Sequence, residues 1–207
     1  MVGLEHLELF PTHVFGKSDV LSAPDHQRIS DDIMGAYDPQ QPRWQSSHAL
    51  WQRKEYKSLV TVVKDCTSQV LGELVYSYEN GREYKFQITG MWANILKPGL
   101  MHMPHTHPNN FFSGVYYVRS DGSEIIFFDP KVQAHMMLPQ RKKDADAKGT
   151  GATATLPSLT NGLYIFPAWL LHWVPPNQSG DIRISISWNI QLKGEMGSRD
   201  LFQYARY

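Results

Sequence analysis

The sequence predicts a mainly β fold, a jelly roll or a related β-sandwich that is braced by N-terminal helices. Two observations support this prediction. Beyond Asn80-Gly81, short runs alternate between apolar and polar residues, as strands with one buried face do. Before that point, apolar residues recur every three or four positions, which is typical of amphipathic helices. We therefore expect one domain over residues 1–207, with a helical bracing part in 1–82 and a jelly-roll core in 83–192.

The N-terminal part predicts one short strand and two helices. Residues 7–15 suggest a first strand, and residues 24–37 carry a helical pattern of apolar side chains. The clearest helix is predicted over 51–76, where the apolar stripe would pack against a sheet. The stripe consists of Leu59, Val62, Val63, Cys66, Val70, Leu71 and Leu74.

The C-terminal part predicts a series of strands. Their expected ranges are 84–96, 112–118, 124–128, 163–166 and 182–190. In the last of these, the isoleucines and Trp188 alternate with Arg183, Ser185, Ser187 and Asn189, so one face would be apolar and the other polar. Residues 131–158 are rich in small and basic residues and suggest a loop or a lid.

The amino-acid composition limits the classes of protein to which this chain can belong. Apolar residues make up 42% of the 207 residues, and the 20 basic side chains equal the 20 acidic ones. This zero formal charge argues against a dedicated nucleic-acid surface. The single cysteine, Cys66, permits no internal disulfide, and residues 1–10 lack the pattern of a signal peptide. We expect a cytoplasmic protein without a membrane span; the sequence makes no prediction of oligomeric state.

Three histidines form the candidate metal site. His105 and His107 are two residues apart, so on a strand both imidazoles would point to the same face. His172 follows a predicted strand, and antiparallel pairing could bring it opposite that pair. Three neutral nitrogen donors suit iron(II), and also zinc, cobalt or nickel. The chain has nine histidines, so the pair alone is weak evidence; spacing does not exclude His102 or His135 as ligands.

Arg183 is a candidate receptor for a carboxylate. On a strand it would point the same way as Ser185, and a guanidinium beside a hydroxyl suits a carboxylate, because the planar fork makes two parallel bonds. An arginine that faced inward without such a partner would be a buried unpaired charge. Alternation alone also permits Arg183 to face solvent.

Four motifs together resemble those of the 2-oxoglutarate/iron(II) oxygenase superfamily. The run from Asn94 to Gly99 is similar to its Asn-x-Tyr-x-x-Gly motif, with Leu96 where tyrosine is common. HTHPNNFFSGVYYV, from His105, resembles a prolyl-hydroxylase-type metal motif that leads into a strand. GLYIFP before His172 and the Arg-Ile-Ser of Arg183 match the second metal strand and the Arg-x-Ser position. The resemblance spans residues 92–190 and is strongest to small bacterial and phage-type members with a His-x-His-Pro motif.

The resemblance implies a double-stranded β-helix and a set of site residues. The implied metal ligands are His105, His107 and His172, and the implied 2-oxoglutarate-binding residues are Arg183, Ser185, Tyr117 and Asn94. Tyr116 would point to the opposite face. The main departure is His107, which stands where the family usually has a carboxylate; Asp129 and Asp181 are carboxylates without the expected spacing.

The implied function is an iron(II)- and 2-oxoglutarate-dependent oxygenase. It would use dioxygen to hydroxylate a small molecule, an amino acid or a peptidyl side chain, and would release succinate and carbon dioxide. Two alternatives remain open: a cupin-like three-histidine dioxygenase that does not use 2-oxoglutarate, and a jelly roll that binds metal without catalysis. Five aromatic residues could line the pocket or belong to the core, namely Trp92, Phe111, Phe112, Trp169 and Trp173.

Overall fold

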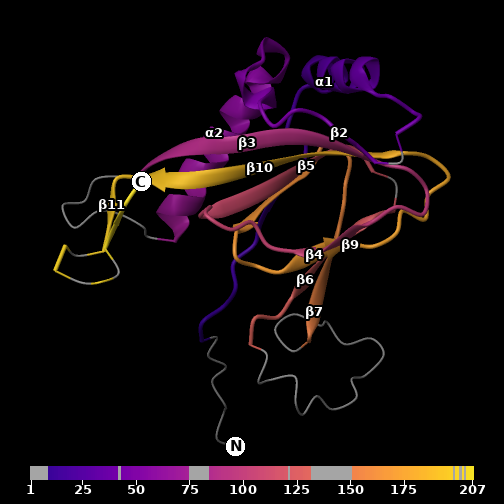
Figure 1. Ribbon diagram of the computed structural model, residues 1–207. Helices are drawn as coiled ribbons and strands as arrows, with labels where there is room; N and C mark the ends of the chain where they lie inside the picture. The colour runs from indigo at the N-terminus through magenta and orange to yellow at the C-terminus, as the bar shows by residue number, and fades with distance from the viewer. Residues whose placement is uncertain are drawn as a thin grey trace, which may run out of the picture.

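The computed structural model describes residues 9–41, 43–74, 84–120, 122–131, 151–197, 199–200, 202 and 204–207. Two antiparallel sheets face each other, and two α-helices lie on the outer side of the larger sheet (Figure 1). The predicted mainly β, helix-braced jelly roll is confirmed.

The larger sheet has six strands that come from distant parts of the chain. Their order across the sheet is β1 (Phe15–Lys17), β8 (Leu163–Pro167), β5 (Phe112–Arg119), β10 (Arg183–Lys193), β3 (Lys85–Leu96) and β2 (Trp44–Gln45). The long strand β10 is central, since it pairs antiparallel with both β3 and β5.

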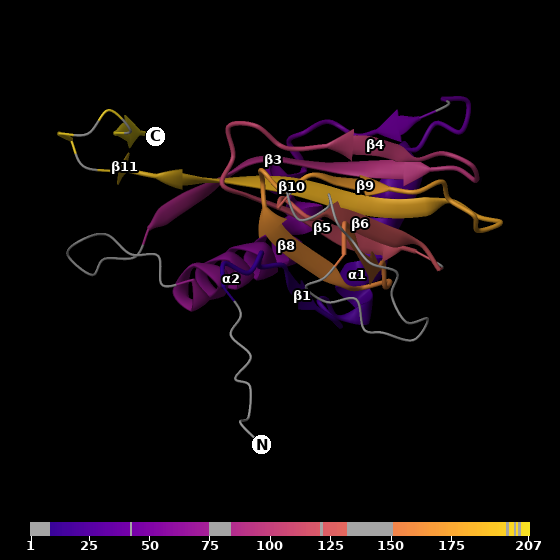
Figure 2. The ribbon, with the colours of Figure 1, turned by 90° about the horizontal axis from the view of Figure 1, so that it is seen from below.

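The smaller sheet lies across from β10 and β5. Its strands are β4 (His102–His105), β9 (His172–Val174), β6 (Glu124–Phe128) and β7 (Thr153–Pro157), in that order. In Figure 2, which shows the molecule from below, β4, β9 and β6 of the smaller sheet overlap β3, β10 and β5 of the larger sheet. A separate small hairpin of β11 (Glu195–Met196) and β12 (Ala205–Arg206) extends from the end of β10.

Helices α1 (Ala23–Ala36) and α2 (Lys57–Glu73) cover the outer face of the larger sheet (Figure 1). The Ser22 side chain caps α1 by accepting a hydrogen bond from the Asp25 backbone N–H, and Pro24 lies in the first turn, where no N–H is needed. Ile29 and Ile33 of α1 pack into the same apolar core as the outer face of the sheet.

The alternation of β10 places the site between the sheets. Its four apolar side chains from Ile184 to Ile190 are fully buried in the helix-side core. The intervening positions therefore face the smaller sheet, and Arg183, Ser185 and Ser187 line a cavity there. The predicted division of this strand into an apolar and a polar face is confirmed.

The structure corrects the boundaries of two N-terminal elements. The main helix begins at Lys57 rather than at residue 51, because Leu50–Gln52 and Lys54–Tyr56 form separate 3₁₀ turns. Of the strand predicted over residues 7–15, only Phe15 is in a strand; residues 7 and 8 lie outside the described part. Phe10 has a φ of 57°, which is incompatible with an extended chain.

Three strands of the smaller sheet were not predicted. β4 and β9 have four and three residues, too few for an alternating pattern to be recognised. β7 contradicts part of the loop expected over residues 131–158, because Thr153–Pro157 pairs along its whole length with β6. Residues 132–150 of that expected loop lie outside the described part of the chain. Among the described helices, none is long and apolar enough to cross a membrane.

Gly114 is a position where we expect a side chain to be costly. It pairs directly with Trp188 of β10, and an added Cβ would clash with carbon atoms of the indole ring. Because this ring is fully buried, Gly114→Ala should lower the free energy of unfolding by about 1–3 kcal/mol in denaturant titrations.

Gly35→Ala is the matched control, since no atom lies within 4 Å of the added methyl group at the end of α1. Its free energy of unfolding should stay unchanged or rise by up to about 1 kcal/mol. Equal stability of the two variants would contradict the packing described for Gly114.

Candidate metal and co-substrate site

Three imidazoles converge on one point between the sheets. His105 ends β4, His172 begins β9, and the two residues are directly paired in the β4–β9 ladder. The backbone N–H of His107 donates to the Ala168 carbonyl at 2.9 Å, which fixes His107 beside them. One nitrogen from each ring lies within 4.8 Å of the others, so a single ion could contact all three.

Backbone carbonyls orient two of the rings. The Nδ1 atom of His105 lies 2.7 Å from the Met103 carbonyl, and that of His172 lies 2.8 Å from the Leu170 carbonyl. A carbonyl can only accept, so both Nδ1 atoms carry a proton, and in a neutral ring this leaves Nε2 with the free lone pair. Metal-binding histidines usually have a fixed tautomer of this kind, because the ring nitrogen that does not bind the metal donates a hydrogen bond to a neighbouring group.

Burial keeps two of these side chains neutral. It lowers the pKa of His172 to about 3 and that of His107 to about 4, because the charged form would be poorly solvated. Metal binding requires a neutral imidazole, so these rings are ready to bind a cation at neutral pH. In the described part of the chain, the group contains no carboxylate. Asp181 instead contacts Arg119 at 3.2 Å.

Arg183 is buried between the sheets with unsatisfied donors. It is 2% exposed, and among the described residues it makes no ion pair. Its guanidinium lies over the Tyr117 ring at 5.2 Å, and Nη2 donates to the Ser158 hydroxyl at 3.4 Å. Within the described chain, the Arg183 Nε and the Tyr117 hydroxyl have no hydrogen-bond partner. A buried cation with free donors is costly, and a bound carboxylate would relieve that cost.

One cavity of about 240 Å³ joins the imidazoles to Arg183. Ser185 lines it; Tyr117, its partner across β10 and β5, is fully buried and is not among the residues that line the cavity. The Tyr117 hydroxyl stays protonated, because burial raises the pKa of Tyr117 to about 12. Asn94 also lines the cavity, but its amide already accepts from Gln45 Nε2 at 2.9 Å and donates to the Ser187 hydroxyl at 3.4 Å. The donor set therefore fits a carboxylate at the Arg183 end and a metal at the histidine end.

His102, which spacing left open as a possible ligand, also lines this cavity. Regular alternation would place positions 102 and 105 on opposite faces of a strand, but the β4–β9 register shifts between them. Both imidazoles can therefore reach the cavity. Burial lowers the pKa of His102 to about 4, so this fourth imidazole is neutral too. His135, the other histidine that spacing left open as a ligand, lies outside the described residues.

The remaining predicted positions lie in the cavity, in the core or at the surface. Of the five aromatic residues considered for the pocket, Trp92 lines it, together with Phe166, which was not predicted. Phe111 and Phe112 pack in the helix-side core, and Trp169 is 57% exposed. Leu96 is buried and offers no polar group.

Tyr116 points away from the cavity, as its position next to Tyr117 predicts. Its hydroxyl lies 2.5 Å from His26 Nδ1 and donates to Asn161 Oδ1 at 2.9 Å. These contacts tie α1 to the helix side of the larger sheet, so Tyr116 has a structural role.

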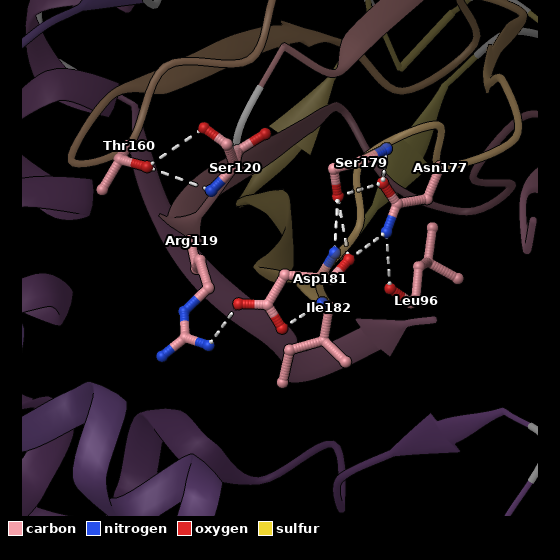
Figure 3. Close-up of polar contacts among 8 residues, drawn as sticks. All are labelled: Leu96, Arg119, Ser120, Thr160, Asn177, Ser179, Asp181 and Ile182. Atoms are coloured by element: carbon pink, nitrogen blue, oxygen red, sulfur yellow. Dashed lines mark hydrogen bonds and ion pairs between the residues drawn. The ribbon is translucent and has the colours of Figure 1, made fainter. Parts of the chain in front are cut away.

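A polar network fixes the chain just before Arg183 (Figure 3). The buried amide of Asn177 donates to the Leu96 carbonyl at 3.0 Å and to the Asp181 carbonyl at 2.8 Å. Its oxygen accepts from the Ser179 hydroxyl at 2.8 Å. The turn between β9 and β10 is thus tied to the end of β3, which sets where Arg183 enters the sheet.

The pKa values predict an acid-labile metal-free protein. Unfolded histidines take up protons near pH 6.5, whereas folded His107 and His172 resist protonation until about pH 4 and pH 3. Stability contributed by these groups is therefore complete above about pH 6.5 and is lost progressively as the pH falls. The melting temperature of the metal-free protein should drop between pH 7 and pH 5, a range above most carboxylate titration.

The double variant His107→Gln, His172→Asn should show a smaller drop in melting temperature over the same pH range, because two imidazoles with lowered pKa values are removed. A wild-type melting temperature that stays constant between pH 7 and pH 5 would contradict the low pKa values of His107 and His172.

A comparison with known protein families covers the stretch of chain that contains this site. Residues 90–189 match the family described as "Putative 2OG-Fe(II) oxygenase"; this stretch contains all three histidines and Arg183. No curated protein matches the sequence.

Solved structures share the fold at low sequence identity. The epimerase SnoN of nogalamycin biosynthesis, solved with Fe³⁺, alpha ketoglutarate and nogalamycin RO, is 11% identical with a TM-score of 0.62, over 87% of this chain and 79% of SnoN. A Pseudomonas putida prolyl-4-hydroxylase is 13% identical, with a TM-score of 0.56 over 87% and 85% of the two chains. A Trichoplax adhaerens prolyl hydroxylase, solved with a hypoxia inducible factor peptide, is 9% identical, with a TM-score of 0.57 over 86% and 83%.

The family match covers the sheet core and the site just described, and the surrounding fold is that of solved oxygenases. Residues 90–189 thus match the family model of 2-oxoglutarate/iron(II) oxygenases, and the chain shares its fold with solved structures of such enzymes.

Proposed function

We propose that this enzyme hydroxylates a small molecule, an amino acid or a peptidyl side chain, with 2-oxoglutarate and dioxygen consumed and succinate and carbon dioxide released. The observation that carries the proposal is the single cavity that has three imidazoles at one end and an unpaired, buried guanidinium at the other. A dianion with a chelating end and a distal carboxylate matches this arrangement.

In this proposal, His105, His107 and His172 hold the metal through nitrogens whose lone pairs are free. The backbone carbonyls of Met103 and Leu170 keep two of the rings in the required tautomer. Bound iron(II), with 2-oxoglutarate and dioxygen, supplies the oxidising chemistry of the family. The protein supplies the orientation of the reactants and a largely buried cavity that limits access of water.

Arg183, Ser185 and Tyr117 hold the distal carboxylate of 2-oxoglutarate. In the described chain, the guanidinium Nε and the Tyr117 hydroxyl are both without a hydrogen-bond partner, and a carboxylate at the guanidinium would satisfy the Nε. Asn94 has a positioning role, because its amide is hydrogen-bonded to Gln45 and Ser187 on the cavity wall. These roles assign each polar group of the receptor a definite task.

The charge balance also supports a dianionic co-substrate. Since a metal-bound imidazole is neutral, three such ligands leave the metal its full double charge, and Arg183 adds one more. A carboxylate ligand, as is usual in the family, would cancel one of these charges. Two negative charges on 2-oxoglutarate would leave the occupied site with one net positive charge.

Arg183→Met should separate co-substrate binding from folding. Methionine fills much of the space without a charge, so the metal-free protein should melt at or above the wild-type temperature, because a buried unpaired cation is removed. The same variant should lose at least about 100-fold in affinity for 2-oxoglutarate, as loss of a buried charged contact costs roughly 3 kcal/mol or more. Calorimetric titration and thermal denaturation measure the two effects.

Arg119→Met is the control, since Arg119 lies on the neighbouring strand, is partly exposed and pairs with Asp181. It should bind 2-oxoglutarate as the wild type does. Wild-type affinity in Arg183→Met would remove the basis of the co-substrate assignment.

A succinate-release screen over amino acids, small metabolites and peptides tests the proposed reaction. With a substrate present, the iron(II) enzyme should form succinate and a product heavier by one oxygen atom, while His172→Ala should form neither. Dioxygen uptake without succinate would instead favour a cupin-like three-histidine dioxygenase. Tight metal binding without dioxygen uptake for any compound would favour a non-catalytic metal-binding protein.

A further inference from the structure

A second hollow adjoins the metal site on its outer side. It is an open surface groove of about 500 Å³, and it shares Trp92 and His107 with the inner cavity. A molecule in this groove would therefore contact the same imidazole that we propose as a metal ligand. Nothing in the co-substrate assignment uses this groove.

The strand β10 connects the two hollows. Arg183, Ser185 and Ser187 line the inner cavity, and Asn189, the next residue on the same face, lines the outer groove. Arg183 therefore lies at one end of this row of polar side chains on β10, and the outer groove lies at the other end. The histidines lie across from the row. This arrangement puts a groove occupant and the co-substrate on opposite sides of the metal site.

The groove wall is polar but has no charged side chain. It is built from three asparagines, a threonine, a glycine, two histidines and Trp92, with no Asp, Glu, Lys or Arg. A free amino acid carries an ammonium and a carboxylate, and a nucleotide carries phosphates, and neither would find an opposite charge here. The wall therefore favours an uncharged occupant with hydrogen-bonding groups.

Two asparagine amides have hydrogen-bonding capacity to spare. Asn189 Oδ1 accepts from the Ser113 hydroxyl at 2.8 Å, which orients the amide while its Nδ2 makes no hydrogen bond with any described residue. Asn109 has its backbone held by Gln191, which donates to the Asn109 carbonyl at 3.0 Å. Its exposed side chain makes no hydrogen bond within the described chain, and its φ of 61° gives this residue a turn conformation. Both amides are thus positioned but free.

The one large aromatic side chain of the groove wall is not open as a stacking surface. Trp92 is 9% exposed, and His48 stacks on it with ring centroids 4.7 Å apart and an interplanar angle of 22°. A sugar ring would need an open aromatic face, whereas a peptide group needs a paired donor and acceptor. An asparagine amide presents both at the spacing of a peptide group.

We propose that this groove binds an uncharged segment of a peptide and directs one of its side chains past His107 to the metal site. The inference rests on the proposed function in one respect: the reaction must take place at a metal bound by the three histidines. It narrows the three substrate classes left open above to one, the peptidyl side chain. The groove would recognise peptide groups and small polar side chains of the substrate, without ion pairs.

Affinity selection on the anaerobic iron(II)–2-oxoglutarate enzyme tests this inference. The probes are a pool of heptapeptides with blocked ends and no charged residue, a matched pool with Asp or Lys at each position, free amino acids and neutral oligosaccharides. The uncharged peptides should be retained at least 10-fold more than any other probe, and those retained should gain one oxygen when dioxygen is admitted.

Asn109→Ala and Asn189→Ala should each reduce retention at least 5-fold. Gln27→Ala, which removes an exposed amide on α1 that does not line the groove, should leave retention unchanged. Preferred retention of charged peptides or oligosaccharides, or retention independent of both asparagines, would overturn the inference. So would retention of no peptide by an enzyme that binds iron and 2-oxoglutarate normally, whereas failure to bind either of those would count against the proposed function instead.

Discussion

The central constraint in this molecule is a guanidinium buried between two sheets with no carboxylate partner among the described residues. Arg183 is placed there because β10 must turn its isoleucines and Trp188 toward the helices, so its other face points at the smaller sheet. A buried charge of this kind costs several kcal/mol unless it is paired. The fold therefore keeps a group that destabilises the ligand-free protein. A ligand with a carboxylate would pair with this group, and the loss of the unpaired charge would add to the free energy of binding.

The three imidazoles impose the complementary constraint. They too are held inward by strand register and by backbone carbonyls, and burial keeps His107 and His172 neutral. A cation at this point would therefore keep its charge, and the anion bridging it to Arg183 would face two positive centres. In the proposed site, His107 takes the place of the family's usual carboxylate, which changes the charge of the site while three ligand atoms still lie within 4.8 Å of one another. Metal and co-substrate are thus expected to bind in a mutually dependent way.

Much of this arrangement could be predicted from sequence, because it depends on long, regular alternation. The polar face of β10 and the division between Tyr116 and Tyr117 follow from a period of two. His105 and His107 lie close together for another reason, because β4 ends at His105 and His107 is held beyond it by the Ala168 carbonyl. The features that were missed depend on irregularity or on distant contacts. His102 reaches the cavity through a register shift, β7 lay within a segment of loop-like composition, and His48 stacks on Trp92 from a distant part of the chain. None of these leaves a local signal.

The most direct test is a crystal structure of the protein prepared anaerobically with iron(II) and 2-oxoglutarate. We expect one iron bound by nitrogens of His105, His107 and His172, with no protein carboxylate as ligand, and the distal carboxylate of 2-oxoglutarate on the Arg183 guanidinium. Iron bound elsewhere, or a co-substrate whose distal carboxylate contacts another residue while Arg183 stays unpaired, would contradict the proposed site.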